Sequence, residues 1–277
     1  MAQTYTCEDS VIDRALGRLK GRGLVSPDAR FDREAPQNLR SQIAYRDYDF
    51  LLTLSRTAEV ETVRSILAWL VRVGVAPQGS SYDEEAYLEL RREAARFDIP
   101  GTSITPVMER LLYMLSWLRR PRRVIGLGTY CGYALVWAVG ASCGPGRVYG
   151  AEKVYGIDID AEVTARARKN LSKLAHTDHI QFLAEDGLAA VERLEGPFDY
   201  VYLDAEGEEL GKRIYWELLQ RLYAKIAEGG WVLAHDTTVP PFASHLEGYL
   251  AFVRDSANFR DSFSFDIDPF GLELSIK

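Results

Sequence analysis

Glycines and acidic residues follow five short apolar runs in the second half of the chain, where side chains could bind a ligand and do chemistry. They are the glycine-rich segment 126–132 (GLGTYCG), Asp158, Asp186, Asp204 and the pair His235 and Asp236. Glycines let a backbone turn sharply and approach a ligand closely, and a helix that begins there offers unpaired N–H donors. A carboxylate can accept hydrogen bonds from both hydroxyls of a ribose, or from the amino group of an adenine. Together the residues predict a pocket for a ribosylated adenine, with a cationic or metal-assisted centre beside it.

Alternating strands and helices from residue 101 onward must position these side chains. The predicted strands are seven apolar runs, at 122–128, 153–160, 179–186, 198–206, 231–238, 262–268 and 271–277. Segments of helical character separate the first six runs, and only a short turn separates the last two. This pattern predicts an α/β fold, a Rossmann-like doubly wound seven-stranded sheet with an antiparallel C-terminal hairpin. Ligands bind such sheets beyond the carboxyl ends of the strands, where the glycines and acids above are placed.

The first hundred residues are predicted to form a helical extension. Three helices are expected there, over 11–20, 58–74 and 82–97. Ser10 is expected to cap the first helix and Thr57 the second, which Gly74 closes. We predict that the chain divides into residues 1–100, which form a lid, a dimerisation surface or both, and residues 101–277, which carry the chemistry. We therefore expect a homodimer.

The composition argues against several classes of protein. The chain has 277 residues and a net charge of −7, from 33 Lys and Arg against 40 Asp and Glu. A nucleic-acid partner is not expected, because the chain has only short basic runs and no basic stripe. Three cysteines, none in a CxxC pair, predict neither a disulfide framework nor a structural zinc site. The longest apolar run is too short to span a membrane, and the first residues lack the apolar core of a signal peptide. We expect a cytoplasmic protein with no membrane partner.

The motifs as an ordered set resemble a known family. They are VIGLGTYCGYALVWA (124–138), VYGIDID (154–160), AEDGLAAVERL (184–194), FDYVYLDAE (198–206) and GGWVLAHDTT (229–238). In order and spacing they resemble the class I S-adenosylmethionine-dependent methyltransferases, and most of all the branch that includes the catechol and caffeoyl-CoA O-methyltransferases. The resemblance covers about residues 101–277, which would be the methyltransferase domain. It implies S-adenosylmethionine as cofactor and O-methylation of a small-molecule substrate in secondary metabolism.

The resemblance also implies roles for individual residues. The methionine part of the cofactor would be wrapped by Gly126, Gly128, Thr129, Tyr130 and Gly132. Asp158 would bind the ribose hydroxyls, Asp186 would face the adenine, and Asp204 would lie beside the cofactor as well. In the metal-dependent branch, acids that match Asp204 and Asp236 hold a divalent cation, which lowers the pKa of the acceptor hydroxyl. The implied catalytic residues are therefore Asp204, His235 and Asp236.

Three positions depart from the pattern of the family. Gly126 stands where the first strand usually ends in Glu, Thr237 where a third metal ligand is usually Asn, and Gly207 where the general-base Lys of the catechol enzyme would fall. Two alternatives for the centre follow. Either its two acids bind Mg²⁺ or another divalent cation, or it has no metal and Asp204 or His235 acts as the base. The alternatives to O-methylation are methylation of an amine, and an intramolecular alkylation or cyclisation that uses the same cofactor pocket.

Overall fold

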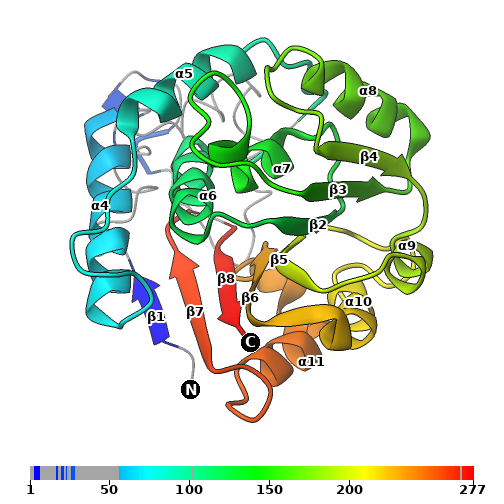
Figure 1. Cartoon of the computed structure of the whole chain (residues 1–277). Helices are drawn as coiled ribbons and strands as arrows, with labels where there is room; N and C mark the ends of the chain where they lie inside the picture. The colour runs from blue at the N-terminus through cyan, green and yellow to red at the C-terminus, as the bar shows by residue number, and fades with distance from the viewer. Residues whose placement is uncertain are drawn as a thin grey trace.

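A mixed sheet of eight strands runs through the centre of the molecule (Figure 1). The computed structural model describes residues 3–6, 17, 20–21, 23, 26–28, 56–101, 103–268 and 270–277. The strands are β1 (Gln3–Thr6), β2 (Arg123–Leu127), β3 (Lys153–Asp158), β4 (Ile180–Ala184), β5 (Phe198–Leu203), β6 (Ile226–His235), β7 (Asp261–Asp266) and β8 (Leu272–Ile276). Their order across the sheet is β1-β7-β8-β6-β5-β2-β3-β4. Of these strands only β8 runs antiparallel to its neighbours, β6 and β7.

Helices cover both faces of the sheet (Figure 1). The first face packs against α4 (Arg56–Arg72), α5 (Glu84–Ala94), α6 (Pro106–Arg119), α7 (Tyr133–Ala138) and α8 (Ala161–Leu171). The second face packs against α9 (Gly187–Arg193), α10 (Ile214–Leu222) and α11 (Ala243–Val253). Short 3-10 turns lie at η1 (Gly140–Ser142), η2 (Tyr223–Lys225) and η3 (Pro240–Phe242). Side chains alternate between the two faces along each strand. In β5, Tyr200 and Tyr202 enter the first core, whereas Val201 and Leu203 enter the second.

The seven strands predicted from the sequence all form, and so does the antiparallel hairpin of β7 and β8. The sheet gains an eighth strand that the sequence did not predict, because β1 pairs in parallel with β7 at the edge. The strand order reverses at β2, which lies between β3 and β5. The carboxyl ends of β2 to β6 therefore meet at one edge of the sheet, which is where a ligand binds in this architecture.

Of the predicted helix over 11–20 only residues 17 and 20 are described, so this helix and its expected cap Ser10 lie mostly outside the described residues. The other two predicted helices form as α4 and α5. Thr57, which was expected to cap the second of these helices, is the second residue of α4 as described, and its capping role stays a prediction. Gly74 does close the helix, with a φ of 82° that an L side chain rarely adopts. Trp69 of α4 packs edge-on against Phe263 and Phe265 of β7, so this helix shares a core with the sheet. The homodimer stays a prediction.

A buried ion pair joins α4 to α6 within this core. The side chains of Glu59 and Arg110 are 1% and 0% exposed, and Arg110 Nε donates to Glu59 Oε1 at 2.6 Å. The same guanidinium pairs with Glu84 and lies over the ring of Tyr87, with its central carbon 4.0 Å from the ring centroid. A charge buried to this extent requires a partner, because desolvation is costly. The helices are thus held by complementary charges as well as by apolar contacts.

At the far edge of the sheet, β4 pairs with β3 on one side. Its Phe182 carbonyl accepts two hydrogen bonds from the guanidinium of Arg168 in α8, from Nε at 3.1 Å and from Nη2 at 2.8 Å. The aromatic ring of Phe182 is buried against the glycine loop that follows β2. Helix α8 is therefore fixed to the edge strand by a charged side chain.

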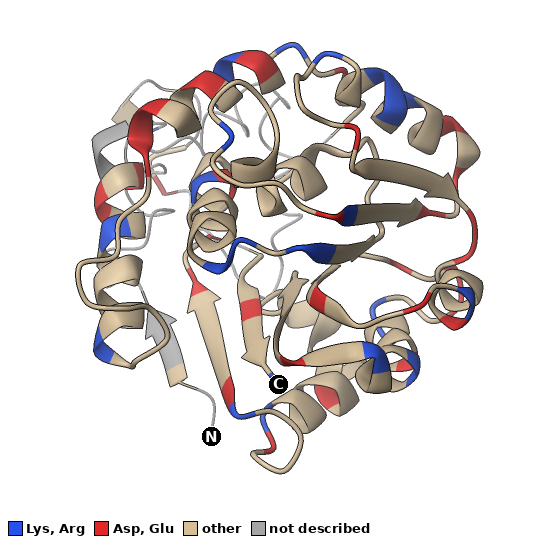
Figure 2. Ribbon diagram, viewed as in Figure 1, with Lys and Arg blue, Asp and Glu red and all other residues tan. Residues whose placement is uncertain are grey.

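Charges of both signs alternate over the helices and loops (Figure 2). In the described part of the chain, Lys and Arg are interspersed with Asp and Glu and do not gather in a single stripe (Figure 2). None of the helices described is both long enough and apolar enough to cross a bilayer.

Candidate active site

The glycine loop turns sharply between β2 and α7. Gly128 and Gly132 have φ angles of 76° and 82°, which favour glycine. A Cβ added at Gly128 would lie 2.3 Å from Cα of Ala205, and one at Gly132 would lie 2.7 Å from the ring of Phe182. The loop can therefore lie directly against the segment that follows β5 only because it has no side chain at Gly128. Gly126 lies within β2, where a Cβ would meet Leu135 at 2.8 Å.

Asp158 ends β3 with its carboxylate fixed by two backbone donors. Its Oδ2 accepts from the N–H of Tyr130 at 2.8 Å, and its Oδ1 accepts from the N–H of Asp160 at 3.1 Å. Asp160 caps α8, because its side chain accepts from the N–H groups of Glu162 and Val163. Asp186 also caps a helix, because its Oδ1 accepts from the N–H of Ala189 at 2.9 Å. The family resemblance implies a ligand role for Asp186, and in the structure one of its oxygens also caps α9.

A cavity of about 1070 Å³ connects the glycine loop with the ends of β5 and β6. It brings together Gly128, Thr129, Tyr130, Asp158, Asp186, Asp204, His235 and Asp236. Gly126 and Gly132 do not line the cavity, and their part is to let the loop pack. Thr237, at the position of the third metal ligand in the family, does not line the cavity either. Most of the predicted site residues thus share one space.

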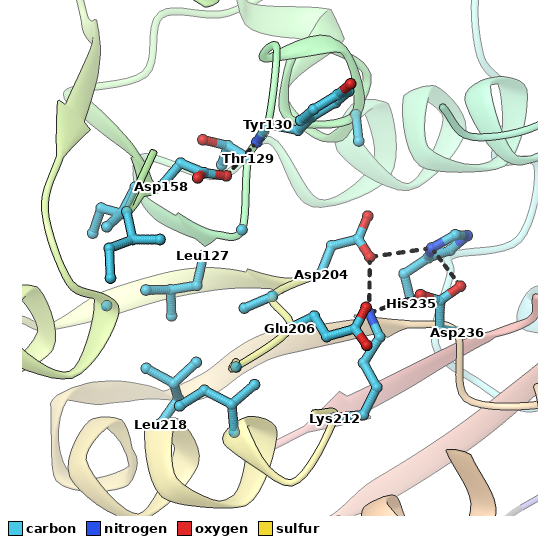
Figure 3. A pocket seen from close by; sticks show the side chains of 18 of the residues that line it. Leu127, Thr129, Tyr130, Asp158, Asp204, Glu206, Lys212, Leu218, His235 and Asp236 are labelled. Carbon is cyan, nitrogen blue, oxygen red and sulfur yellow. Dashed lines mark hydrogen bonds and ion pairs between the residues drawn. The ribbon is translucent and has the colours of Figure 1, made fainter. Parts of the chain in front are cut away.

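At one end of this cavity, four ionisable side chains form a cluster (Figure 3). Asp204 and Asp236 follow adjacent strands, since Leu203 of β5 pairs with Ala234 of β6. Between the two acids lies Lys212, whose Nζ is 2.7 Å from Asp236 Oδ2 and 3.5 Å from Asp204 Oδ1. His235 Nδ1 is 3.3 Å from Asp236 Oδ1 and 3.4 Å from Asp204 Oδ1. Each acid thus contacts both a lysine and a histidine.

The charges in this cluster stabilise one another. Burial lowers the pKa of His235, but the negative charges of Asp236 and Asp204 outweigh it and raise the pKa to about 9. Burial raises the pKa of Asp204, but the positive charges of His235 and Lys212 outweigh it and hold that pKa below its usual value. Burial lowers the pKa of Lys212, and the two carboxylates more than reverse the effect. Near neutral pH the cluster therefore holds a carboxylate, an ammonium and an imidazolium side by side.

Lys212 is the residue of this site that the sequence reasoning missed. Its side chain is 3% exposed, and its Nζ also donates to the hydroxyl of Tyr215 at 3.2 Å. The Tyr215 hydroxyl in turn donates to the backbone carbonyl of His235 at 3.2 Å. On the other side, Tyr202 donates to Asp204 Oδ2 at 3.3 Å. The sequence does contain a signal for this lysine. Two acids predicted to converge require a positive charge between them, and Lys212 is the only lysine between Lys173 and Lys225.

A divalent cation does not fit this cluster as it stands. Ligand atoms of Asp204, His235 and Asp236 lie within 4.8 Å of one another, which is a spacing that a metal ion could use. A Mg²⁺ or Ca²⁺ ion would lie roughly 2.0–2.6 Å from each carboxylate oxygen. The ammonium of Lys212 already lies against oxygens of both acids, so a metal ion on the same oxygens would meet a second positive charge. The side chains present therefore favour the metal-free alternative.

A family model and two curated relatives are similar to this chain. Residues 125–237 match the model of a methyltransferase domain. A catechol O-methyltransferase of Niastella koreensis is 26% identical over 141 residues, which are 50% of this chain and 61% of that protein. A caffeoyl-CoA O-methyltransferase of Stellaria longipes is 23% identical over 163 residues, which are 57% of this chain and 63% of that protein. The chain thus spans less than two thirds of the length of these relatives.

Solved structures show the same fold. The O-methyltransferase from Bacillus cereus, solved in complex with S-adenosylhomocysteine (SAH), has a TM-score of 0.51 and 17% identity to this chain. The similarity covers 79% of this chain and all of that one (100%). The sheet order, the glycine loop after β2 and the match over residues 125–237 are consistent with this fold. Residues 125–237 thus match a methyltransferase domain, and the chain is similar to catechol and caffeoyl-CoA O-methyltransferases.

Proposed function

We propose that this protein transfers a methyl group from S-adenosylmethionine to a hydroxyl of a small molecule, of the kind made in secondary metabolism. The observation that carries the proposal is the continuous cavity from Gly128 and Asp158 to Asp204 and His235. One end of it suits a nucleoside cofactor, and the other end holds groups that can accept a proton and stabilise an oxyanion. The names of the catechol and caffeoyl-CoA relatives support a hydroxyl acceptor on a small molecule.

The cofactor end fits S-adenosylmethionine. The close approach of Gly128 to Ala205 leaves backbone and no side chain beside the cavity. Asp158 lines the cavity with its carboxylate already oriented by the N–H of Tyr130, as a group that binds two ribose hydroxyls should be. Asp186 lines the cavity further along and could accept from the adenine amino group. When bound there, S-adenosylmethionine would supply a methyl group activated by the positive charge on sulfur.

The acceptor end has an apolar wall beside the charged cluster. The ring of Phe270 lies 5.8 Å from the imidazole of His235, measured between centroids, and Val239 and Phe242 line the same cavity. Such a wall would hold the body of an aromatic or apolar acceptor while its hydroxyl faces Asp204. Fixing the hydroxyl in this way replaces a bimolecular encounter with an oriented one, which is a large part of catalysis in transfers of this kind.

In this proposal Asp204 accepts the proton of the acceptor hydroxyl. It is the better of the two candidate bases, because the imidazole of His235 carries a proton near neutral pH and has no free site to accept another. A carboxylate whose pKa is held low is a weak base. Stabilisation of the negative oxygen must therefore provide much of the rate, and the positive charges of the cluster lie next to Asp204.

The test is to incubate the protein with S-adenosylmethionine and a panel of phenols and amines, and to analyse the products. A methylated phenol together with SAH is expected. A methylated amine would show that the acceptor atom is nitrogen. Methylthioadenosine would indicate intramolecular alkylation. Calorimetry that detects no binding of SAH would refute the cofactor assignment itself.

We further propose that residues 1–100 cover the substrate side of the cavity and contribute to a homodimer. Support comes from Tyr130 of the glycine loop, whose hydroxyl donates to the carbonyl of Pro100 at the end of this segment. Ser103 and Ile104, just beyond it, line the cavity. Sedimentation of the full chain should give the mass of a dimer, and a monomer at all concentrations would refute this part.

A further inference from the structure

We propose that the ammonium of Lys212 takes the place of the divalent cation used by the metal-dependent branch of the family, so that this protein works without a metal. The inference rests on the proposed function and adds to it the residue that supplies the positive charge. Two carboxylates at the ends of adjacent strands repel each other unless a positive charge lies between them. In this chain Lys212 provides that charge from its own side chain.

The position of the ammonium carries the argument. Lys212 Nζ contacts Asp204 Oδ1 and Asp236 Oδ2, which are oxygens of the two acids that would otherwise bind the metal. Its side chain is only 3% exposed. Lys212 lines the cavity, as Figure 3 shows. A lysine is almost never buried unless it is paired, and here two carboxylates pair with it. The burial therefore fixes a positive charge between the two acids inside the cavity.

The surrounding chain holds Lys212 in this place. Gly207 and Gly211 form a small closed loop after β5, with N–H to carbonyl distances of 3.1 and 2.8 Å between them. Lys212 follows this loop directly, and its Nζ lies 5.1 Å from the ring centroid of Tyr215 and 5.6 Å from that of Phe242. The sequence position where the catechol enzyme has its lysine is occupied here by Gly207, which belongs to the loop. Lys212 thus approaches the acids from a different point of the chain.

The chemistry balances without a metal or a redox partner. The acceptor hydroxyl passes its proton to Asp204, and the oxygen forms a bond to the methyl carbon as the bond from that carbon to sulfur breaks. The sulfonium becomes a neutral thioether, and the proton later leaves Asp204 to solvent. Lys212 keeps its three protons throughout and stabilises the oxyanion as the charge develops, as a positive group aimed at a developing oxyanion does.

The experiment measures metal binding and turnover on the full chain after treatment with EDTA. Wild-type protein should bind no Mn²⁺ in electron paramagnetic resonance titrations at submillimolar metal. Its turnover should be the same before and after EDTA treatment. Lys212→Met removes the ammonium and keeps the stem, so the two acids are freed. This variant should gain a Mn²⁺ site and lose about 100-fold in turnover, with part of the loss restored by Mn²⁺. Lys169→Met, on the exposed face of α8, is the matched control and should match wild type in both measurements.

Two further measurements keep the outcome decisive. Lys212→Arg keeps a positive charge, so it should not gain the Mn²⁺ site. If circular dichroism shows that Lys212→Met does not fold, Lys212→Arg is the variant used to test the role of the charge. Stoichiometric Mn²⁺ binding to wild-type protein, or an unchanged Mn²⁺ titration and turnover in Lys212→Met, would overturn the proposal. SAH calorimetry on the same samples separates the two proposals. A protein that binds no SAH fails as a methyltransferase, while the Mn²⁺ titration still decides whether Lys212 fills the metal position.

Discussion

The backbone N–H of Tyr130 donates a 2.8 Å hydrogen bond to Oδ2 of Asp158, which joins the glycine loop after β2 to the end of β3. Tyr130 reaches this position with a φ of 47°, in the left-handed region that a non-glycine residue seldom adopts. Strain of this kind persists where the surrounding structure enforces it, and it is frequent at ligand sites. The loop and the acid are therefore oriented together before any ligand arrives.

Replacing Asp158 with Ala should weaken SAH binding roughly 10- to 100-fold, because a charge-assisted hydrogen-bond acceptor is lost. Isothermal titration calorimetry at constant salt measures the change. Asp178→Asn, an exposed acid that does not line the cavity, should bind SAH like the wild type. Equal affinities of Asp158→Ala and wild type would remove Asp158 from the cofactor site.

Replacing Gly128 with Ala should abolish SAH binding and lower the melting temperature. The added Cβ would meet backbone atoms of Ala205 at 2.3 and 2.4 Å, and the φ of 76° adds strain. Backbone cannot move aside as a flexible side chain can, so the loop must shift away from β5. Gly150→Ala is the matched control, since nothing lies within 4 Å of its Cβ position. Scanning calorimetry with and without SAH would show the difference, and a Gly128→Ala variant that binds normally would contradict the close approach.

The free energy of unfolding should depend on the protonation of His235. The pKa in the folded protein is about 9, above the ordinary value of 6.5, so the folded state holds this proton more tightly than the unfolded state. The stabilisation is complete below pH 6.5 and is lost as the pH rises through 9. The proton on His235 contributes at most about 3 kcal/mol to the free energy of unfolding. Urea denaturation from pH 6.5 to above 9 should show wild type losing more stability than His235→Gln, and parallel curves would rule out the raised pKa.

Removing the buried guanidinium should cost more than removing an exposed one. Arg110→Met leaves Glu59 buried without its partner and should destabilise the fold by about 3–5 kcal/mol. Adding Glu59→Gln to this variant should recover part of the loss, because the uncompensated charge disappears. Arg92→Met, whose side chain is 72% exposed, should change stability by less than about 0.5 kcal/mol. Chemical denaturation of the wild type, Arg92→Met, the single variants Arg110→Met and Glu59→Gln, and their double variant measures these differences. Additive losses in the double variant would argue against the ion pair.

Much of the sheet could be predicted because each central strand is a short apolar run that ends in Gly or Asp. Two details were beyond local pattern. β1 is the short polar sequence QTYT, and it forms a strand through pairing with β7, whose residues lie about 260 positions further along the chain. β6 begins at Ile226, ahead of the predicted run over 231–238, and its pairing with β5 shifts register after Phe198. Bulges of this kind depend on the partner strand and not on the local sequence.

The acids of the site could be placed from sequence because strand ends fix them to one edge of the sheet. Their electrostatic partners could not be placed in this way. Lys212 lies in a connection whose path is set by the pairing of Gly207 with Gly211, and no strand or helix period gives the direction of its side chain. The protonation of His235 likewise depends on three neighbouring side chains, which come together only in the folded chain.

The bond from Arg168 to the Phe182 carbonyl also affects how molecules of this protein meet one another. An unprotected edge strand is a template on which a strand of another molecule can add, and aggregation often begins there. At β4 the guanidinium occupies a carbonyl that such an incoming strand would need. This edge of the sheet is thus protected against strand-by-strand self-association. Arg168→Met would leave the carbonyl of an edge strand free and should increase aggregation on heating.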